Sequence, residues 1–342
     1  MADSGDPALD VLFLPLQQGL LPWPAGQALF LRARSGAALG AWRNRDLRCQ
    51  QSFKPWAAAL QRDGFDVADQ AGGEFDLVLL LPTRQREAAR ASLAEGLQRL
   101  SPRGVLLVCA HNNEGARSIE SDLRQLAGTV HSLSKQHCRV MWVARESAQI
   151  DAARLDEWTQ ADAPRAILEG RYRSRPGLFA WDRVDVASAL LADALPGDLA
   201  GAAADFGAAW GYLSDALLSR CPGIASLDLF EAEARALPLA QANLEMHAAR
   251  VRLGFHWHDV AAGVPGAFDV IVSNPPFHVD RADRPELGQA FIRSASQALR
   301  QGGRLLLVAN RHLPYEAVLR EGFARCQVLR EAQGFKVIEA IR

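Results

Sequence analysis

Residues 268–278 read Phe268-Asp269-Val270-Ile271-Val272-Ser273-Asn274-Pro275-Pro276-Phe277-His278. A run of Phe, Val and Ile is typical of a strand buried on both faces of a parallel sheet. Two prolines cannot continue its hydrogen-bonded ladder, so the strand is predicted to end at Asn274. Open α/β sheets bind ligands beyond the carboxyl ends of their strands. The turn would therefore present the Asn274 amide and free backbone carbonyls as acceptors for a ligand's N–H groups.

The pattern around this strand occurs twice in the chain. Residues 74–145 contain FDLVLLL, PRGVLLVCA and HCRVMWVA, and residues 267–342 contain FDVIVS, GGRLLLVAN and FKVIEAIR in the same order, each with helical patterns between them. A lysine precedes the final strand of each copy, at Lys135 and Lys336. Such self-similarity predicts an internal duplication of one α/β domain.

The two copies differ at the turn that follows the apolar strand. The first has Leu80-Leu81-Pro82-Thr83 where the second has Ser273-Asn274-Pro275-Pro276, and no glycine-rich segment precedes the first copy's sheet. We expect a degenerate N-terminal domain at residues 1–150, with a structural or substrate-docking role. A linker is expected at 151–175 and a domain that carries the chemistry at 176–342.

Three further polar sites precede the turn, each at the end of a predicted strand. Asp205-Phe206-Gly207-Ala208-Ala209-Trp210-Gly211 opens a helical pattern, where a cofactor can approach the backbone, although such a turn serves packing as often. Glu231 could accept both hydroxyls of a ribose, but a lone acid there is more often a solvated helix start. Asp259-Val260 follow a third strand and could read an adenine edge. Four such sites in order favour a nucleotide-like cofactor.

In this order, DxGxxxG, Glu231, Asp259 and SNPPFH resemble the class I S-adenosylmethionine-dependent methyltransferases whose Asn-Pro-Pro-aromatic motif methylates amino groups. More narrowly, the chain is similar to the ribosomal RNA guanine-N2 methyltransferases of the RsmC type and their large-subunit relatives. The similarity includes the segment PGLFAWDRVDVASALL at 176–191 and the tail VANRHLPYEAVL. It implies two tandem Rossmann-like class I methyltransferase domains, of which only the C-terminal one is active.

The resemblance also implies a cofactor, a substrate and a set of residues. The cofactor is S-adenosyl-L-methionine, and the methyl group goes to a guanine N2 amine of ribosomal RNA, 16S rather than 23S. The cofactor-binding positions correspond to Asp205, Phe206, Gly207, Gly211, Glu231, Asp259, Val260 and Asn274. The catalytic positions correspond to Asn274, Pro275, Pro276 and Phe277, with Phe277 stacked on a flipped base. No metal is expected.

Two alternatives remain open. Asn-Pro-Pro-aromatic turns also serve the methylation of adenine N6 and of protein glutamine, because these substrates also present a planar amino nitrogen. The second alternative is a non-catalytic RNA-binding module without cofactor affinity. Ala209 stands where the family usually has glycine, and Pro238 falls within the helix expected after Glu231. Titration with S-adenosylmethionine separates this module from an enzyme.

The composition indicates the size of the protein's cores, its overall charge and its relation to membranes. The chain has 342 residues, 49% of them hydrophobic, which is enough for two packed cores. Its 38 Lys and Arg are balanced by 39 Asp and Glu, so contact with ribosomal RNA or a ribosomal particle must be local. No apolar run reaches ~18 residues, so we expect a cytoplasmic protein without a membrane partner, and the cysteines form no CxxC pair, which fits reduced thiols. We also expect a monomer. Local positive charge is concentrated at Arg165, Arg171, Arg173, Arg175 and Arg183.

Overall fold

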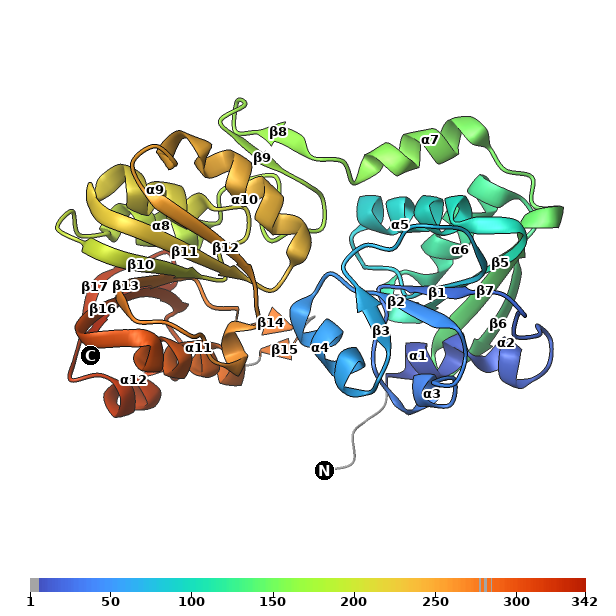
Figure 1. Cartoon of the computed structure of the whole chain (residues 1–342), viewed down its shortest axis with the longest axis horizontal. Helices are drawn as coiled ribbons and strands as arrows, with labels where there is room; N and C mark the ends of the chain where they lie inside the picture. Colours follow the sequence, from blue (N-terminus) through green and yellow to red (C-terminus); the bar gives the residue numbers. More distant parts are fainter. Residues whose placement is uncertain (1–5, 277, 280–281, 284) are drawn as a thin grey trace. The chain divides into compact units, whose positions relative to one another are not determined.

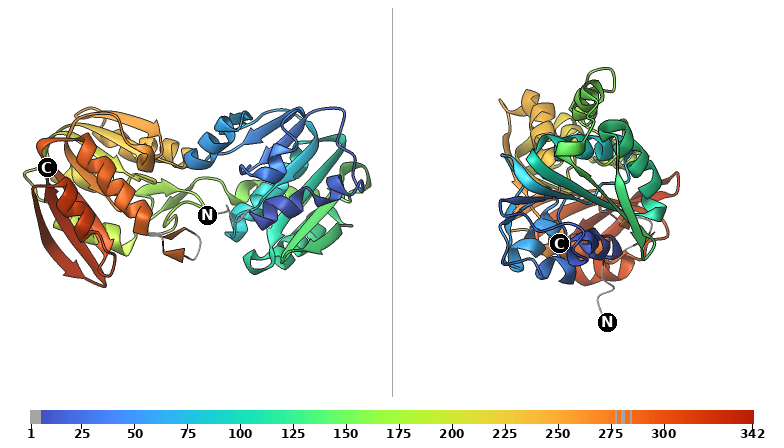
Figure 2. Two further views of the ribbon diagram at one scale, coloured as in Figure 1. Left: turned by 90° about the horizontal axis from the view of Figure 1, so that it is seen from below. Right: turned by 90° about the vertical axis from the view of Figure 1, so that its right-hand side faces the viewer.

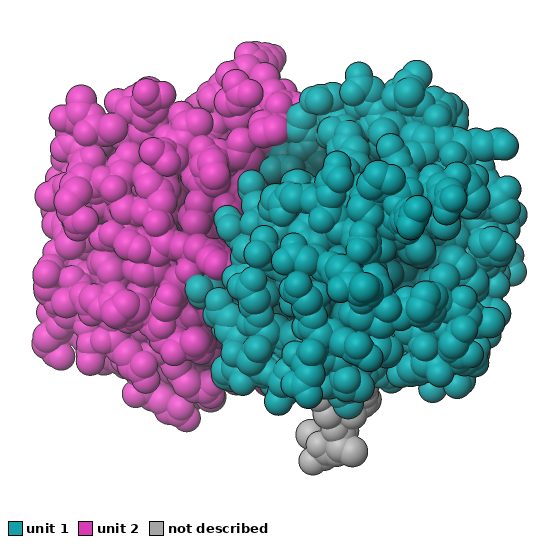
Figure 3. Space-filling model, turned by 45° about the vertical axis from the view of Figure 1, so that its right-hand side comes forward, with its two compact units in different colours: residues 1–163, 175–177 teal, residues 164–174, 178–342 magenta. Residues whose placement is uncertain are grey.

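The computed structural model describes residues 6–276, 278–279, 282–283 and 285–342, and the chain divides into two compact units. Unit 1 comprises residues 1–163 and 175–177, and unit 2 comprises residues 164–174 and 178–342 (Figure 3). The division falls inside the segment for which we expected a linker. Helix α7 (Ala152–Ala161) belongs to unit 1, whereas the hairpin of β8 (Arg165–Ile167) and β9 (Tyr172–Ser174) belongs to unit 2.

Unit 1 contains a seven-stranded sheet in the order β3-β2-β1-β4-β5-β7-β6. Helices cover both faces, because α1, α3 and α4 pack on one apolar cluster and α5, α6 and α7 on the other (Figures 1 and 2). The strands are β1 (Ala28–Leu31), β2 (Leu47–Gln50), β3 (Asp66–Ala68), β4 (Phe75–Leu80), β5 (Leu100–His111), β6 (His131–Lys135) and β7 (Cys138–Ala144). The helices are α1 (Pro7–Leu12), α2 (Leu14–Gln17), α3 (Ala37–Gly40), α4 (Lys54–Arg62), α5 (Arg86–Gln98) and α6 (Ala116–Ala127).

Unit 2 repeats this arrangement with the strand order β12-β11-β10-β13-β16-β18-β17. Helices α8, α9 and α10 cover one face and α11 and α12 the other (Figure 1). The strands are β10 (Ala200–Phe206), β11 (Gly223–Glu231), β12 (Arg252–Trp257), β13 (Phe268–Ser273), β16 (Leu299–Asn310), β17 (Arg325–Ala332) and β18 (Phe335–Ile341), with a short pair, β14 (His278–Val279) and β15 (Ala282–Asp283). The helices are α8 (Val186–Ala194), α9 (Tyr212–Arg220), α10 (Leu237–Leu244), α11 (Pro285–Ala298) and α12 (Glu316–Gly322).

The matching strand orders confirm the predicted pair of doubly wound α/β units. Both sheets also end in an antiparallel strand, β6 or β17, which the sequence pattern does not separate from its surroundings. The register of the strands shows that Lys135 and Lys336 do not occupy equivalent positions, so our prediction that they correspond was wrong. His111 pairs with Cys138 and Asn310 with Phe335, so Lys336 corresponds to the residue after Cys138, which is an arginine. Lys135 instead lies exposed on β6.

Pro238 does not interrupt a helix. It occupies the first turn of α10 (Leu237–Leu244), where a backbone N–H would have no partner within the helix. None of the described helices is long and apolar enough to cross a membrane.

Candidate active site

The predicted polar sites follow neighbouring strands of unit 2. Phe206 of β10 pairs with Phe230 of β11 on one side and with Ser273 of β13 on the other, and β11 pairs with β12. All these pairs are parallel, so the carboxyl ends of the four strands meet at one edge of the sheet. This edge is where doubly wound sheets bind their ligands.

The turn between β10 and α9 has a left-handed backbone conformation at three alternate positions. Gly207, Ala209 and Gly211 have φ angles of 80°, 47° and 91°, all in the left-handed region. Glycine adopts this region freely, whereas an alanine there is strained. The Gly207 N–H donates to the Phe230 carbonyl at 2.9 Å, which holds the turn against β11. We call residues 207–211 the glycine loop.

Glu231 fixes the glycine loop from the end of β11. Its Oε2 accepts from the Ala209 N–H at 2.7 Å and its Oε1 from the Glu233 N–H at 2.8 Å. Burial raises the pKa of Glu231, while these backbone N–H groups act in the opposite direction. A carboxylate oxygen has two lone pairs, so each Glu231 oxygen can accept one more hydrogen bond, for example from a ribose hydroxyl.

Asp205 is completely buried at the end of β10. Its Oδ2 accepts from the Ser214 hydroxyl at 2.7 Å, but its Oδ1 has no hydrogen-bond partner among the described residues. Burial raises the pKa of Asp205 to about 7, and the nearby charge of Glu231 adds to the effect. An unpartnered buried carboxylate oxygen is costly, so the site favours a bound group that donates to it.

Asn274 follows β13 and is held by the start of α8. Its Nδ2 donates to Asp185 Oδ2 at 3.0 Å and to Ser188 Oγ at 2.9 Å. Asp185 is also the N-cap of α8, because the same Oδ2 accepts from the Ser188 N–H at 2.8 Å. The Asn274 Oδ1 has no partner among the residues that the structure describes, and it is left as an acceptor.

Sequence reasoning missed Asp185 and Ser188 as neighbours of Asn274. They lie within the segment PGLFAWDRVDVASALL, but 89 and 86 positions separate them from Asn274. An Asp before an apolar helical pattern is an N-cap signal, and such a signal predicts a helix start rather than a contact across the unit.

One cavity joins Asn274 to the glycine loop. Its lining comes from the segment before α8, the first turn of α8, the glycine loop and the start of α9. The lining residues are Phe179, Ala180, Asp185, Ser188, Gly207, Ala208, Ala209, Trp210, Tyr212, Leu213 and Asn274. The cavity lies entirely within unit 2, at the carboxyl edge of its sheet.

The other residues predicted to form the site differ in their burial and in their contacts. Asp259 caps a short 3-10 helix after β12 and accepts from the Ala261 N–H at 3.0 Å, while Val260 and Phe206 are buried in the core. After Asn274, Pro275 is buried and Pro276 is exposed. Phe277 lies outside the described residues, as does the side chain of His278.

Unit 1 lacks these polar groups at matching positions. Its register pairs Leu31 with both Leu80 and Gln50, as Phe206 pairs with Ser273 and Phe230 in unit 2. The residues of unit 1 at the positions of Asp205, Gly207, Glu231 and Asn274 are therefore Phe30, Arg32, Gln51 and Leu81. No carboxylate remains among them.

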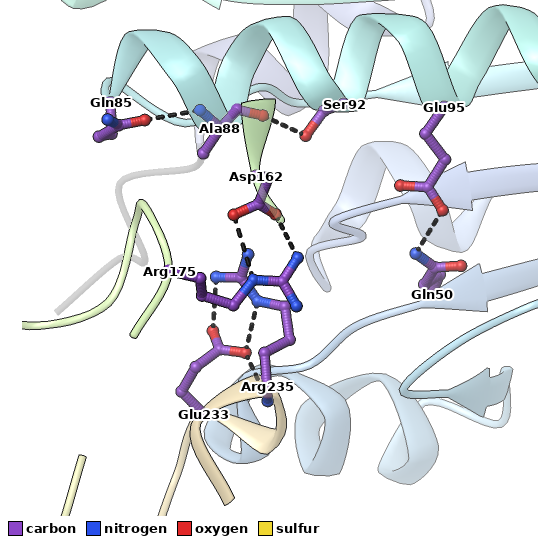
Figure 4. Close-up of polar contacts among 9 residues, drawn as sticks. All are labelled: Gln50, Gln85, Ala88, Ser92, Glu95, Asp162, Arg175, Glu233 and Arg235. Carbon is purple, nitrogen blue, oxygen red and sulfur yellow. Dashed lines mark hydrogen bonds and ion pairs between the residues drawn. The ribbon is translucent and has the colours of Figure 1, made fainter. Parts of the chain in front are cut away.

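The arginines near the boundary between the units are largely engaged. Arg175 donates to Asp162 at 3.2 and 2.6 Å within unit 1 (Figure 4), and Arg171 donates to the buried Asp215 at 2.9 Å within unit 2. These pairs leave less free positive charge than the sequence suggested. The described residues include no group of three or more His, Cys, Asp or Glu that could hold a metal ion.

Known proteins are similar to this chain in sequence and in fold. The methyltransferase small domain model matches residues 169–339, and the model of its N-terminal domain matches residues 41–161. The ribosomal RNA small subunit methyltransferase C of Ectopseudomonas mendocina is 32% identical, over 82% of this chain and 83% of the relative. The protein of that name from Pseudomonas entomophila is 31% identical, over 78% and 80% of the two chains.

A solved structure is similar over both units. The 16S rRNA N2 methyltransferase (RsmC) of T. thermophilus, in complex with AdoMet and guanosine, aligns with a TM-score of 0.79 and 26% identity. The alignment covers 98% of this chain and 92% of that one. The chain therefore belongs to the methyltransferase small domain family and, within it, to the ribosomal RNA small subunit methyltransferases C.

Proposed function

We propose that this chain transfers the methyl group of S-adenosyl-L-methionine to the N2 amine of a guanine in 16S ribosomal RNA. One observation carries the proposal: Asn274, whose Oδ1 is an acceptor without a partner among the described residues, lines the same cavity as the glycine loop. The names of the related proteins support the substrate. Because that substrate is ribosomal RNA, we also propose that the chain acts in the cytoplasm.

The residues present fit this cofactor, which supplies an electrophilic methyl group when bound. Asp205 Oδ1 is buried and lacks a donor within the described chain, so it suits the methionine part, which carries an ammonium group. Glu231 keeps two lone pairs for ribose hydroxyls, and Asp259 lies at the end of the next strand for the adenine. The left-handed backbone of the glycine loop leaves room for close approach.

Asn274 would act on the target amine. The lone pair of guanine N2 is delocalised into the ring, which makes the amine a poor nucleophile. The Asn274 Oδ1 and the Pro275 carbonyl would each accept one N–H, orient the lone pair and stabilise the positive charge that develops on nitrogen. Charge-assisted hydrogen bonds contribute about 1.5–3 kcal/mol each. A contribution of ~2.7 kcal/mol corresponds to about a hundredfold in rate.

Nucleoside mass spectrometry tests this function. Unmodified ribosomal RNA and both ribosomal subunits are incubated with the protein and labelled S-adenosylmethionine. We expect label in N2-methylguanosine of 16S RNA. Label in N6-methyladenosine would show that the enzyme methylates adenine instead of guanine. Absence of label together with absence of cofactor binding would favour the non-catalytic module.

We further infer that unit 1 contributes to RNA docking. A cavity at the amino ends of β1, β2 and β3 is lined by Arg43, Arg45 and Arg48 together with Asp46 and Asp66. Arg48 pairs with Asp66 at 3.3 Å, whereas Arg43 and Arg45 form no ion pair with the described residues. Both are exposed, and arginine suits phosphate oxygens through its fork of N–H donors.

A further inference from the structure

The orientation of the Asn274 amide is set by its surroundings. A primary amide has two N–H hydrogens, and here two acceptors lie within reach of Nδ2, Asp185 Oδ2 at 3.0 Å and Ser188 Oγ at 2.9 Å. Both donors are thus used within the protein. The opposite orientation would direct the Asn274 oxygen against the Asp185 carboxylate, which has no hydrogen to donate.

Asp185 is itself held firmly. It caps α8 through the Ser188 N–H, and α8 packs into the core of unit 2 through the buried side chains of Ala187, Leu190 and Leu191. Ser188 is 7% exposed. A residue that fixes another side chain is most effective when a rigid element carries it, and the start of a packed helix meets that condition.

We propose that Asp185 is a positioning residue for methyl transfer: its carboxylate, assisted by Ser188, forces the Asn274 amide to direct its oxygen at the target amine. The inference rests on the proposed function, since it assigns a task to Asn274. The carboxylate acts in two ways. It can accept hydrogen bonds but cannot donate them, which selects one of the two amide orientations. Its negative charge also polarises the Asn274 amide toward a more negative Oδ1.

The variant Asp185→Asn separates positioning from folding. Asparagine is as good an N-cap as aspartate, so α8 and the fold should persist. Its capping amide oxygen, the atom that accepts from the Ser188 N–H, still accepts from Asn274 Nδ2 but without a negative charge, so the Asn274 orientation is held more weakly and its Oδ1 is less polarised. We expect turnover to fall about tenfold, with unchanged KM for RNA, unchanged affinity for S-adenosylmethionine and an unchanged melting temperature.

A matched control is available in unit 1. Asp151 caps α7 by accepting from the Arg154 N–H at 2.9 Å, with no part in the cavity. Asp151→Asn makes the same chemical change at an N-cap and should leave turnover unchanged. Equal losses in the two variants would attribute the effect to helix capping and overturn the proposal.

A double-mutant cycle with Asn274→Ala gives the decisive readout. If Asp185 acts through Asn274, adding Asp185→Asn to Asn274→Ala should reduce turnover no further. A further tenfold loss would mean that Asp185 acts by another route, and full activity of Asp185→Asn alone would equally overturn the inference. Failure of the proposed function is distinct, because then the wild-type protein itself would place no label in N2-methylguanosine.

Discussion

Gln51 in unit 1 occupies the strand position that Glu231 occupies in unit 2. Each follows the residue paired with the last residue of β1 or β10, Gln50 with Leu31 and Phe230 with Phe206. Gln51 Oε1 accepts from the Phe53 N–H at 2.9 Å, and Glu231 Oε1 accepts from the Glu233 N–H at 2.8 Å. The glutamine thus keeps a scaffold contact of the acid but lacks its charge.

This relationship predicts the behaviour of Glu231→Gln. The glutamine can keep the contact with the Glu233 N–H, but its Nε2 cannot accept from the Ala209 N–H. The glycine loop should loosen, at a cost of about 1 kcal/mol in stability. The loss of a charged acceptor should weaken the binding of S-adenosylmethionine at least tenfold, about 1.4 kcal/mol. Isothermal titration calorimetry checks the affinity.

Gln51→Glu is the control for that variant. It creates an acid in unit 1, but Phe30 and Leu81 still replace the other polar groups, so the stoichiometry should remain one cofactor per chain. Unchanged affinity in Glu231→Gln would contradict the role of Glu231. A second cofactor bound by Gln51→Glu would contradict the degenerate character of unit 1.

Asn274→Ala should reduce turnover about a hundredfold, because it removes the acceptor that we propose stabilises the charged amine. Binding of S-adenosylmethionine should persist, since Asp205, Glu231 and the glycine loop are untouched. Single-turnover methylation of ribosomal RNA measures the effect, with the exposed Asn113→Ala of unit 1 as control. Wild-type turnover in Asn274→Ala would refute the assignment.

Asp205 should make the stability of unit 2 depend on pH. Its pKa is raised to about 7 by burial, whereas an unfolded chain releases this proton near pH 4. Its contribution to the unfolding free energy is therefore fully present below about pH 4 and is lost as the pH rises to 7. The loss is at most about 4 kcal/mol.

Urea unfolding between about pH 4.5 and about pH 8 tests this linkage. Asp205→Asn is neutral throughout and should show a smaller fall in stability than the wild type. Parallel curves for the two proteins would mean that other groups cause the pH dependence.

Ala209→Gly should stabilise unit 2. Ala209 has a φ angle of 47°, which strains a residue with a Cβ atom. Glycine removes that strain, and the net gain is about 0.5–1 kcal/mol after the greater entropy of the unfolded chain is included. Ala216→Gly within α9 is the control and should destabilise by about 1 kcal/mol. A lower melting temperature for Ala209→Gly would contradict the argument.

Arg45→Ala tests RNA docking by unit 1. Loss of one phosphate contact should raise the KM for RNA, leave kcat unchanged and reduce the slope of log K against log salt by about one. Arg117→Ala, an exposed arginine on α6, removes the same charge elsewhere in unit 1. Equal effects of the two substitutions would show that RNA binding depends on the total charge of unit 1 and not on a docking site at Arg45.

Much of the architecture follows from local sequence. The apolar run from Phe268 to Ser273 predicts a buried strand, and Pro275 and Pro276 predict its end, because these effects depend on neighbouring residues alone. The repeated FD-hydrophobic pattern predicts two similar units, and both sheets have the same strand order. The match of Lys135 with Lys336 failed because it relied on spacing, whereas the register of β18 against β16 sets the true correspondence.

The sequence by itself determined the two α/β units, the strand ends that carry Asp205, Glu231 and Asn274, and the family resemblance. Periodicity, turn residues and motif order are local properties, so they can be read without coordinates. Only the tertiary structure decided which way the Asn274 amide points. That orientation depends on Asp185, which packing brings within 3.0 Å from 89 positions away, and no local pattern encodes such a contact.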